Sequence, residues 1–218
     1  HNAGVSALTA RRYDDARRMF ILATALAPEQ PDPYVGLARM HVEQGKYAEA
    51  VDDYAQALER RENPEHRYHR ANSLLALRRT AEALKDYDGA VELEPTVARY
   101  RYGRARGRIA ADDRAGALDD LNRCLKADPR QREALLQRAM LHHASKKLDL
   151  AEADFTAALK IEATADAVRR LSKVCQDKED WDRAVYYLES AIRLCPGDDA
   201  LRRSLQEELD DVKKRKNP

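Results

Sequence analysis

The chain has 218 residues, with 39 lysine and arginine residues against 38 aspartate and glutamate residues. This near balance excludes a strong overall attraction to nucleic acid or to a membrane surface. Because no run of about 18 or more apolar residues is present, a membrane-spanning helix is not expected. Helix-favouring residues are abundant, whereas glycine and proline number only 8 each, which predicts an all-α chain with short turns.

A pattern of three positions recurs from one end of the chain to the other. An alanine is followed four residues later by a large residue and seven residues later by a second small residue. The alanines are Ala16, Ala50, Ala83, Ala117, Ala151 and Ala184. The large residues are Phe20, Tyr54, Tyr87, Leu121, Phe155 and Leu188. Successive alanines lie 33 or 34 residues apart, so the chain contains six copies of one structural repeat.

Two further positions define the helices and the limits of each copy. Twelve residues before the alanine, every copy has a small residue, which lets two helices approach closely: Gly4, Ala38, Ala71, Ala105, Ala139 and Ser172. Twelve residues after it, four copies have a proline, which cannot continue a helix but can start the next one: Pro28, Pro95, Pro129 and Pro196. The predicted repeats, each a pair of antiparallel helices, span residues 1–28, 29–62, 63–95, 96–129, 130–163 and 164–196.

An additional helix is predicted after the sixth repeat, starting near Asp198. Its apolar residues form one stripe: Leu201, Leu205, Leu209 and Val212. We interpret residues 197–212 as a capping helix that covers the last apolar face, with a dimerisation helix as the alternative. Residues 213–218 form a basic tail. Its segment Lys213–Lys216 has the composition of a nuclear-localisation signal, although short basic ends are common on soluble proteins.

The repeated positions resemble the tetratricopeptide-repeat (TPR) family across essentially the whole chain. The segments Tyr34–Glu59 (YVGLARMHVEQGKYAEAVDDYAQALE) and Ala117–Pro129 (ALDDLNRCLKADP) match the family closely. The resemblance implies an all-α, right-handed superhelical solenoid of paired antiparallel helices. Because the residues that the family shares are packing residues, the resemblance is specific for the fold and not for the function.

The sequence contains no recognisable catalytic chemistry. A glycine-rich phosphate loop, a metal-ligand cluster and a nucleophile motif are all absent from it, so no catalytic residue, metal or cofactor is predicted and an enzyme is not expected. The adjacent His142 and His143 point to different faces of a helix and do not chelate together. Cys124, Cys175 and Cys195 fit neither a zinc site nor a disulfide framework, and as reduced thiols they favour a reducing compartment such as the cytoplasm.

Three arginines have an aspartate at a constant distance along the chain. In the third, fourth and fifth repeats the residue before the first-helix small residue is Arg70, Arg104 or Arg138. Sixteen residues after each stands Asp86, Asp120 or Asp154. Because the two helices of a repeat run antiparallel, we expect each arginine to bridge to its aspartate and so to orient the helix pair.

The candidate partner-binding residues come from the resemblance, since the first helices of family members line the concave face and contact ligands. The matching positions are Arg39, Tyr68, Asn72, Arg99, Tyr102, Arg106, Met140, His143, Arg169 and Lys173. The strongest local charge cluster lies at Arg99–Arg108, where Arg99, Tyr102 and Arg106 share one helix face and Arg101, Arg104 and Arg108 share another. This cluster is either a solvated charged face or part of a basic, aromatic groove for an acidic peptide.

The predicted function is a protein–protein interaction scaffold or adaptor that binds a partner peptide or domain in the groove. A co-chaperone-like module that holds unfolded clients is an alternative, supported by the apolar residues Leu75, Ile109, Leu136 and Met140. An RNA-binding repeat protein is disfavoured by the nearly neutral charge.

The family's clamp for the carboxyl-terminal tails of Hsp70 and Hsp90 is not expected, because neither possible frame places its lysines, arginine and asparagines together. The first frame has Val35, Arg39, His69, Arg99 and Gly103, and the second has Tyr68, Asn72, Gly103, Glu133 and Gln137.

Overall fold

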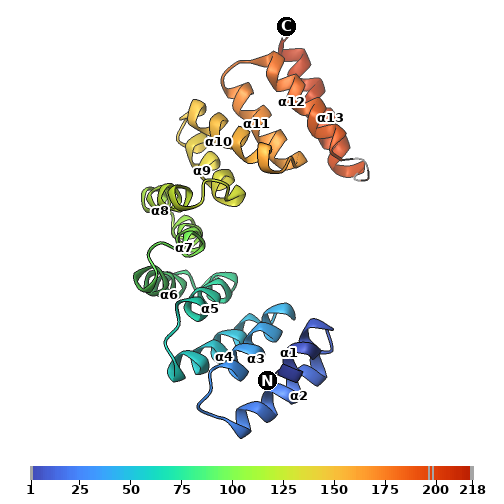
Figure 1. Ribbon diagram of the computed structural model, residues 1–218. Helices are drawn as coiled ribbons and strands as arrows, with labels where there is room; N and C mark the ends of the chain where they lie inside the picture. Colours follow the sequence, from blue (N-terminus) through green and yellow to red (C-terminus); the bar gives the residue numbers. More distant parts are fainter. Residues whose placement is uncertain (1, 196, 198, 217–218) are drawn as a thin grey trace. The chain divides into compact units, whose positions relative to one another are not determined.

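The computed structural model describes residues 2–195, 197 and 199–216, which fold into thirteen α-helices without a β-strand (Figure 1). The helices are α1 (Asn2–Thr9), α2 (Tyr13–Leu26), α3 (Asp32–Glu43), α4 (Tyr47–Arg60), α5 (Pro64–Ala76), α6 (Thr80–Leu93), α7 (Ala98–Ala110), α8 (Arg114–Ala127), α9 (Arg132–Ala144), α10 (Leu148–Ile161), α11 (Ala165–Asp177), α12 (Trp181–Arg193) and α13 (Asp199–Lys216). The predicted all-α class is confirmed. Pro196 and Asp198, where a repeat was predicted to end and a helix to begin, lie outside the described residues.

Each of the six predicted repeat ranges contains one helix pair, from α1 and α2 to α11 and α12. The chain divides into two compact units, residues 1–120 and residues 121–218, with the boundary inside α8. We call these the N-terminal unit and the C-terminal unit and describe each by itself. Within each unit, successive helices pack on one another as the repeat pattern requires.

The repeated residues identified in the sequence form the core. All six alanines of the second helices are fully buried, and the large residues four positions later are at most 1% exposed. A close approach explains one glycine: a Cβ atom at Gly103 would lie 2.6 Å from Tyr87 Cε1 and 2.8 Å from Tyr68 Cε2. The ring of Tyr87, on the second helix of the third repeat, therefore requires a glycine on the first helix of the fourth.

The turn inside each repeat has one residue with positive φ, between 55° and 72°. These residues are Arg11, Gly45, Arg78, Asp112, Lys146 and Glu179. Their spacing matches that of the repeat, yet only the second repeat has a glycine there. This feature is not visible in the sequence, because four of the six residues are arginine, lysine or glutamate, which rarely adopt a left-handed conformation.

The stripe predicted for the last helix packs against the sixth repeat. Leu205, Leu209 and Val212 are at most 3% exposed and lie in one core cluster with residues of α11 and α12. The helix continues past the predicted end at residue 212, so Lys213 and Lys216 belong to it. Lys213 Nζ lies 3.0 Å from Glu189 Oε1 and Lys216 Nζ lies 2.5 Å from an oxygen of Asp182, which ties α13 to α12.

Candidate partner-binding site

The three predicted arginine–aspartate bridges are present, and each is bidentate. Arg70 Nε and Nη2 donate to the two carboxylate oxygens of Asp86 at 2.7 and 2.6 Å, joining α5 to α6. The corresponding distances are 2.8 and 2.7 Å both for Arg104 with Asp120 and for Arg138 with Asp154. The prediction is confirmed: these arginines join the two helices of a repeat, each through an internal carboxylate.

Asp120 binds two further arginines that the sequence analysis did not assign to it. Arg108 Nη1 lies 2.8 Å from Asp120 Oδ2 and Arg101 Nη1 lies 3.7 Å from Asp120 Oδ1, while the carboxylate itself is fully buried. The signal was available, because residues 101, 104 and 108 follow the i, i+3, i+7 spacing of one helix face. Three charges of the Arg99–Arg108 cluster therefore point at an internal carboxylate, and only Arg99 and Arg106 occupy the other face of α7.

A pocket of 470 Å³ opens in the N-terminal unit over the first helices α3, α5 and α7. We call it the N-terminal pocket. Four of the predicted binding residues line it, namely Arg39, Tyr68, Asn72 and Arg106. Its other lining residues are Val42, Glu43, Tyr47, Tyr54, His69, Ser73 and Ala76.

Asn72 is held in a defined orientation in this pocket. The Tyr87 hydroxyl donates to Asn72 Oδ1 at 2.7 Å, and Arg106 Nη1 donates to the same oxygen at 3.3 Å. Burial raises the pKa of Tyr87, so its hydroxyl stays protonated and able to donate. Since Asn72 Oδ1 accepts two hydrogen bonds, its amide nitrogen is the group that can donate to a ligand carbonyl.

An uncharged aromatic wall lies beside Asn72. His69 stacks on Tyr54 with ring centroids 6.0 Å apart and meets Tyr68 edge to face at 5.3 Å. Burial lowers the pKa of His69 and raises the pKa of Tyr54 to about 12, so both rings are predominantly neutral near pH 7. The positive charge of the pocket therefore comes from Arg39 and Arg106, with Glu43 as its one lining carboxylate.

Arg99 and Tyr102 also lie on α7 but do not line this pocket. The Arg99 guanidinium lies 5.1 Å from the centre of the Tyr100 ring, and its Nη2 is 3.6 Å from an oxygen of Glu65. Both of these charged side chains are about half exposed, so this pairing is open to competition by a ligand.

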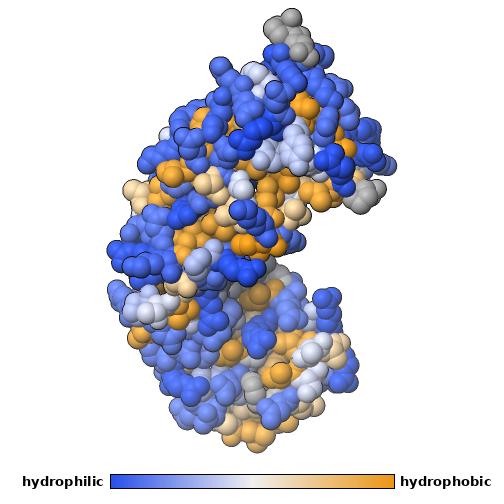
Figure 2. Space-filling view, turned by 45° about the horizontal axis from the view of Figure 1, so that its top comes forward, coloured by the Kyte–Doolittle hydropathy of each residue, from blue (hydrophilic) through white to orange (hydrophobic). Residues whose placement is uncertain are grey.

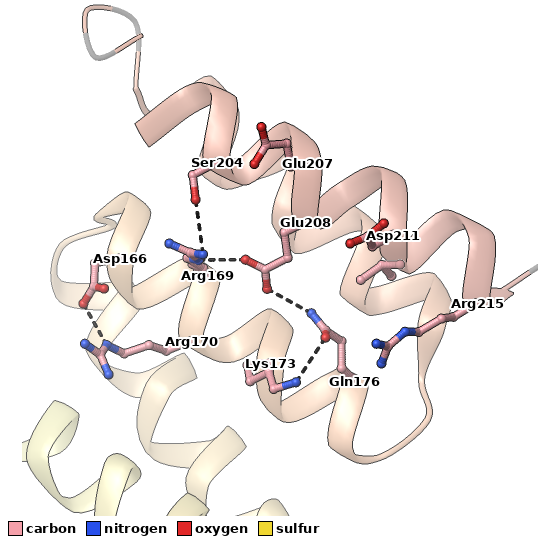
Figure 3. Close-up of a pocket in the computed structure, with 11 residues that line it drawn as sticks. Asp166, Arg169, Arg170, Lys173, Gln176, Ser204, Glu207, Glu208, Asp211 and Arg215 are labelled. Atoms are coloured by element: carbon pink, nitrogen blue, oxygen red, sulfur yellow. Dashed lines mark hydrogen bonds and ion pairs between the residues drawn. The ribbon is translucent and has the colours of Figure 1, made fainter. Parts of the chain in front are cut away.

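In the C-terminal unit, two predicted residues lie in a pocket of 620 Å³ between α11 and α13 (Figure 3). Arg169 Nε donates to Glu208 Oε2 at 2.7 Å, and Lys173 Nζ donates to Gln176 Oε1 at 3.4 Å. Charges of both signs line the pocket, because α13 contributes Glu207, Glu208 and Asp211 opposite the basic residues of α11. The charge of Arg169 is thus compensated internally by a helix that the groove prediction did not take into account.

The remaining two predicted residues, on α9, contact α11. His143 Nε2 lies 3.1 Å from Asp177 Oδ2, and Met140 Sδ lies 3.2 Å from Arg170 Nη1. Hydrogen bonds from Lys146 and from His143 hold the pKa of Asp177 below its usual value. Both predicted residues are half-buried and take part in packing between the fifth and sixth repeats.

A tetratricopeptide-repeat sequence model matches residues 1–67, 35–98, 68–106 and 102–167, which together cover more than half of the chain. The chain belongs to the tetratricopeptide-repeat family. No curated protein sequence matches it. The fold of this family is that of a protein–protein interaction module, so this TPR chain has a fold suited to protein or peptide partners, and TPR proteins are generally non-catalytic scaffolds.

Solved structures of other TPR proteins share the fold of this TPR chain. PilF of Pseudomonas aeruginosa superposes with a TM-score of 0.80 at 20% identity, covering 94% of each chain. YrrB, described as a TPR protein with an unusual peptide-binding site, gives a TM-score of 0.69 at 22% identity, covering 87% of this chain and 98% of its own. A thermophilic TPR protein of Thermus thermophilus, TTC0263, gives 0.62 at 21% identity, covering 84% and 98%. At these identities the likeness establishes the fold alone.

The described residues contain no group of three His, Cys, Asp or Glu side chains placed to hold a metal ion. None of the thirteen described helices combines the length and hydrophobicity that crossing a bilayer requires. Cys124, Cys175 and Cys195 are buried, and burial raises the pKa of Cys175 to about 11, so its thiol is protonated near pH 7.

Proposed function

We propose that this TPR chain is a protein–protein interaction scaffold that binds an acidic partner peptide in the N-terminal pocket. The observation that carries the proposal is the state of two arginines there. Arg39 is exposed and has no described carboxylate within ion-pair distance, and Arg106 is exposed and donates only to the neutral Asn72 among the contacts described. By contrast, Arg70, Arg104 and Arg138 are bound to internal aspartates.

The chemistry of the pocket matches such a ligand. Carboxylates of an acidic peptide would accept the paired hydrogen bonds that a guanidinium donates, and its backbone would accept from the Asn72 amide. The rings of Tyr68 and His69 provide aromatic surface for the peptide's carbon atoms. Arg99 and Tyr102 extend this surface along α7, where an acidic residue of the partner would displace Glu65 from Arg99.

Figure 2 shows hydrophilic residues over most of the visible surface, interrupted by patches of hydrophobic residues. Leu75 packs against the core of the third repeat, and Leu136 and Met140 pack against the core of the fifth and sixth. The apolar residues that supported a co-chaperone-like role are thus largely used in packing. This favours recognition of a specific acidic peptide over general binding of unfolded chains.

The proposal can be tested with short random peptides displayed on phage and selected on the intact chain. We expect selected peptides to be rich in aspartate and glutamate. The double variant Arg39→Glu/Arg106→Glu should weaken binding of the best synthesised peptide by about a hundredfold or more, since each charge-assisted contact contributes roughly 1.5–3 kcal/mol.

The matched control is Arg17→Glu/Arg18→Glu, two exposed residues of α2 whose reversal changes the net charge by the same amount. This control should keep at least most of the affinity. Equal losses in both variants would show that only long-range charge matters, and unchanged binding in the first variant would refute the pocket assignment.

A further inference from the structure

A second, smaller pocket adjoins the N-terminal pocket in the same unit. Its volume is 140 Å³. Five of its nine lining residues are apolar and come from the first three helices: Val5, Leu8, Phe20, Val35 and Gly36. Polar residues complete the lining: Thr9, Asp32, Arg39 and Glu43. We call it the apolar pocket. Arg39 and Glu43 line both pockets, so the two are neighbours on α3.

Small residues on two first helices accommodate one buried ring at the base of the apolar pocket. Phe20 packs between Gly4 of α1 and Gly36 of α3, and a Cβ atom at Gly4 would lie 2.6 Å from Phe20 Cε1. A Cβ atom at Gly36 would also collide with this ring. At the position matching Gly36, the third, fifth and sixth repeats have His69, Gln137 and Arg170, long polar side chains that would fill such a space. In α3, by contrast, this position is a glycine, so no side chain there occupies the space beside the apolar residues.

The size of the pocket suits one apolar side chain. An apolar cavity of about 150 Å³ accommodates a benzene molecule, so 140 Å³ fits a phenylalanine ring or the branched end of leucine. Both carboxylates that line this pocket have a partner: Asp32 lies 3.5 Å from Arg61, and Glu43 accepts a hydrogen bond from the Tyr13 hydroxyl at 3.4 Å. Arg39, at the junction of the two pockets, is the one cation among the residues that line the apolar pocket.

We infer that the partner peptide inserts a phenylalanine, leucine or methionine side chain into the apolar pocket and places an acidic residue, close to it in sequence, on Arg39. This inference rests on the proposed function and makes it more specific. Acidic side chains alone would give weak, salt-sensitive binding, whereas a buried apolar side chain adds affinity and fixes the position of the peptide along the groove. The recognised motif is therefore mixed, one apolar residue beside acidic ones.

The test uses the phage-selected peptides and two variants that fill the apolar pocket from its mouth. Val5→Phe and Thr9→Phe change exposed residues of α1 that line it, so the fold should persist, as circular dichroism can verify. Each should weaken the best selected peptide by about ten- to hundredfold, the loss expected for one unburied apolar side chain. Ile21→Phe, an exposed residue of α2 outside both pockets, is the control and should leave the affinity unchanged.

A second arm replaces the apolar residue of the selected peptide by alanine. This peptide should bind the wild type as weakly as the unchanged peptide binds Val5→Phe, and Val5→Phe should weaken it no further. Selected peptides without a shared apolar residue, or equal binding by Val5→Phe and Ile21→Phe, would overturn the inference.

If peptide affinity depends on Arg39 and Arg106 but is unchanged by Val5→Phe and Thr9→Phe, the proposed function stands and only the insertion of an apolar side chain is refuted. If neither the arginine variants nor the pocket-filling variants change peptide affinity, the proposed function and the further inference are both refuted. Sedimentation of the chain alone checks one other occupant: self-association that Val5→Phe abolishes would show that a second copy fills the pocket, which also overturns the inference.

Discussion

At the scale of single residues, the position within the repeat decides what an arginine does. Arg104 and Arg106 are two residues apart on α7, yet Arg104 is bound to Asp120 and Asp88 whereas Arg106 reaches the N-terminal pocket. Asp120 is the most heavily used of the buried carboxylates, because Arg101, Arg104 and Arg108 all converge on it. Its negative charge is what allows three guanidinium groups to share one side of a helix.

Replacing this carboxylate should therefore be costly. Asp120→Asn keeps the shape but removes the buried counter-charge that three arginines share, and we expect a loss of about 2–4 kcal/mol in the free energy of unfolding. Asp88→Asn is the control, because Asp88 is a second partner of Arg104 but its own side chain is 48% exposed. This variant should lower the free energy of unfolding by less than about 1 kcal/mol. Urea denaturation followed by circular dichroism measures both. Similar small losses would contradict a central role for Asp120.

The sequence predicted some of these contacts and not others for a physical reason. Arg70, Arg104 and Arg138 were paired correctly because a constant 16-residue spacing across antiparallel helices translates directly into proximity. The bond from Arg169 to Glu208 could not be predicted, since it depends on how α13 docks on α11. Spacing within a repeat is encoded locally, whereas the register of an added helix follows from packing of the whole interface.

At the scale of helices and turns, small buried residues explain why the repeat frame could be read from the sequence. Each repeat must place an alanine, glycine or serine where its helices meet, and these positions are visible as a period. The left-handed turn residues were invisible, since arginine, aspartate, lysine and glutamate occupy five of the six positions. The turn geometry is imposed by the two helices that it joins rather than by a local glycine signal.

Because these turn residues have positive φ, a substitution there can change the stability of the fold through the backbone conformation alone. Glu179→Gly should raise the free energy of unfolding by about 0.5–1 kcal/mol, because φ is 60° there and glycine adopts this conformation without strain. Gly45→Ala should lower it by a similar amount, since φ is 72°. Thermal unfolding of both variants provides the measurement. Reversal of both signs, with Glu179→Gly less stable and Gly45→Ala more stable than the wild type, would show that the entropy of the unfolded chain, not turn strain, dominates.

At the scale of the whole molecule, all the helix pairs share one packing pattern. The repeats differ in the side chains that they expose to solvent. The N-terminal unit combines two arginines, an oriented asparagine and an aromatic wall in one pocket. The C-terminal unit offers a pocket of mixed charge, partly neutralised by α13. The candidate residues from the family resemblance are thus divided between two different environments, a division that the equivalent positions in the sequence do not reveal.

The central claim is that an acidic peptide binds in the N-terminal pocket. Nuclear magnetic resonance of the isotope-labelled chain, titrated with the best phage-selected peptide, tests it most directly because each amide reports its own surroundings. We predict that the Asn72 side-chain amide shifts, together with backbone amides near Arg39, Tyr68 and Arg106. Shifts confined to residues 132–216 or to the second helices α4 and α6, with the Asn72 amide unmoved at saturation, would contradict the claim.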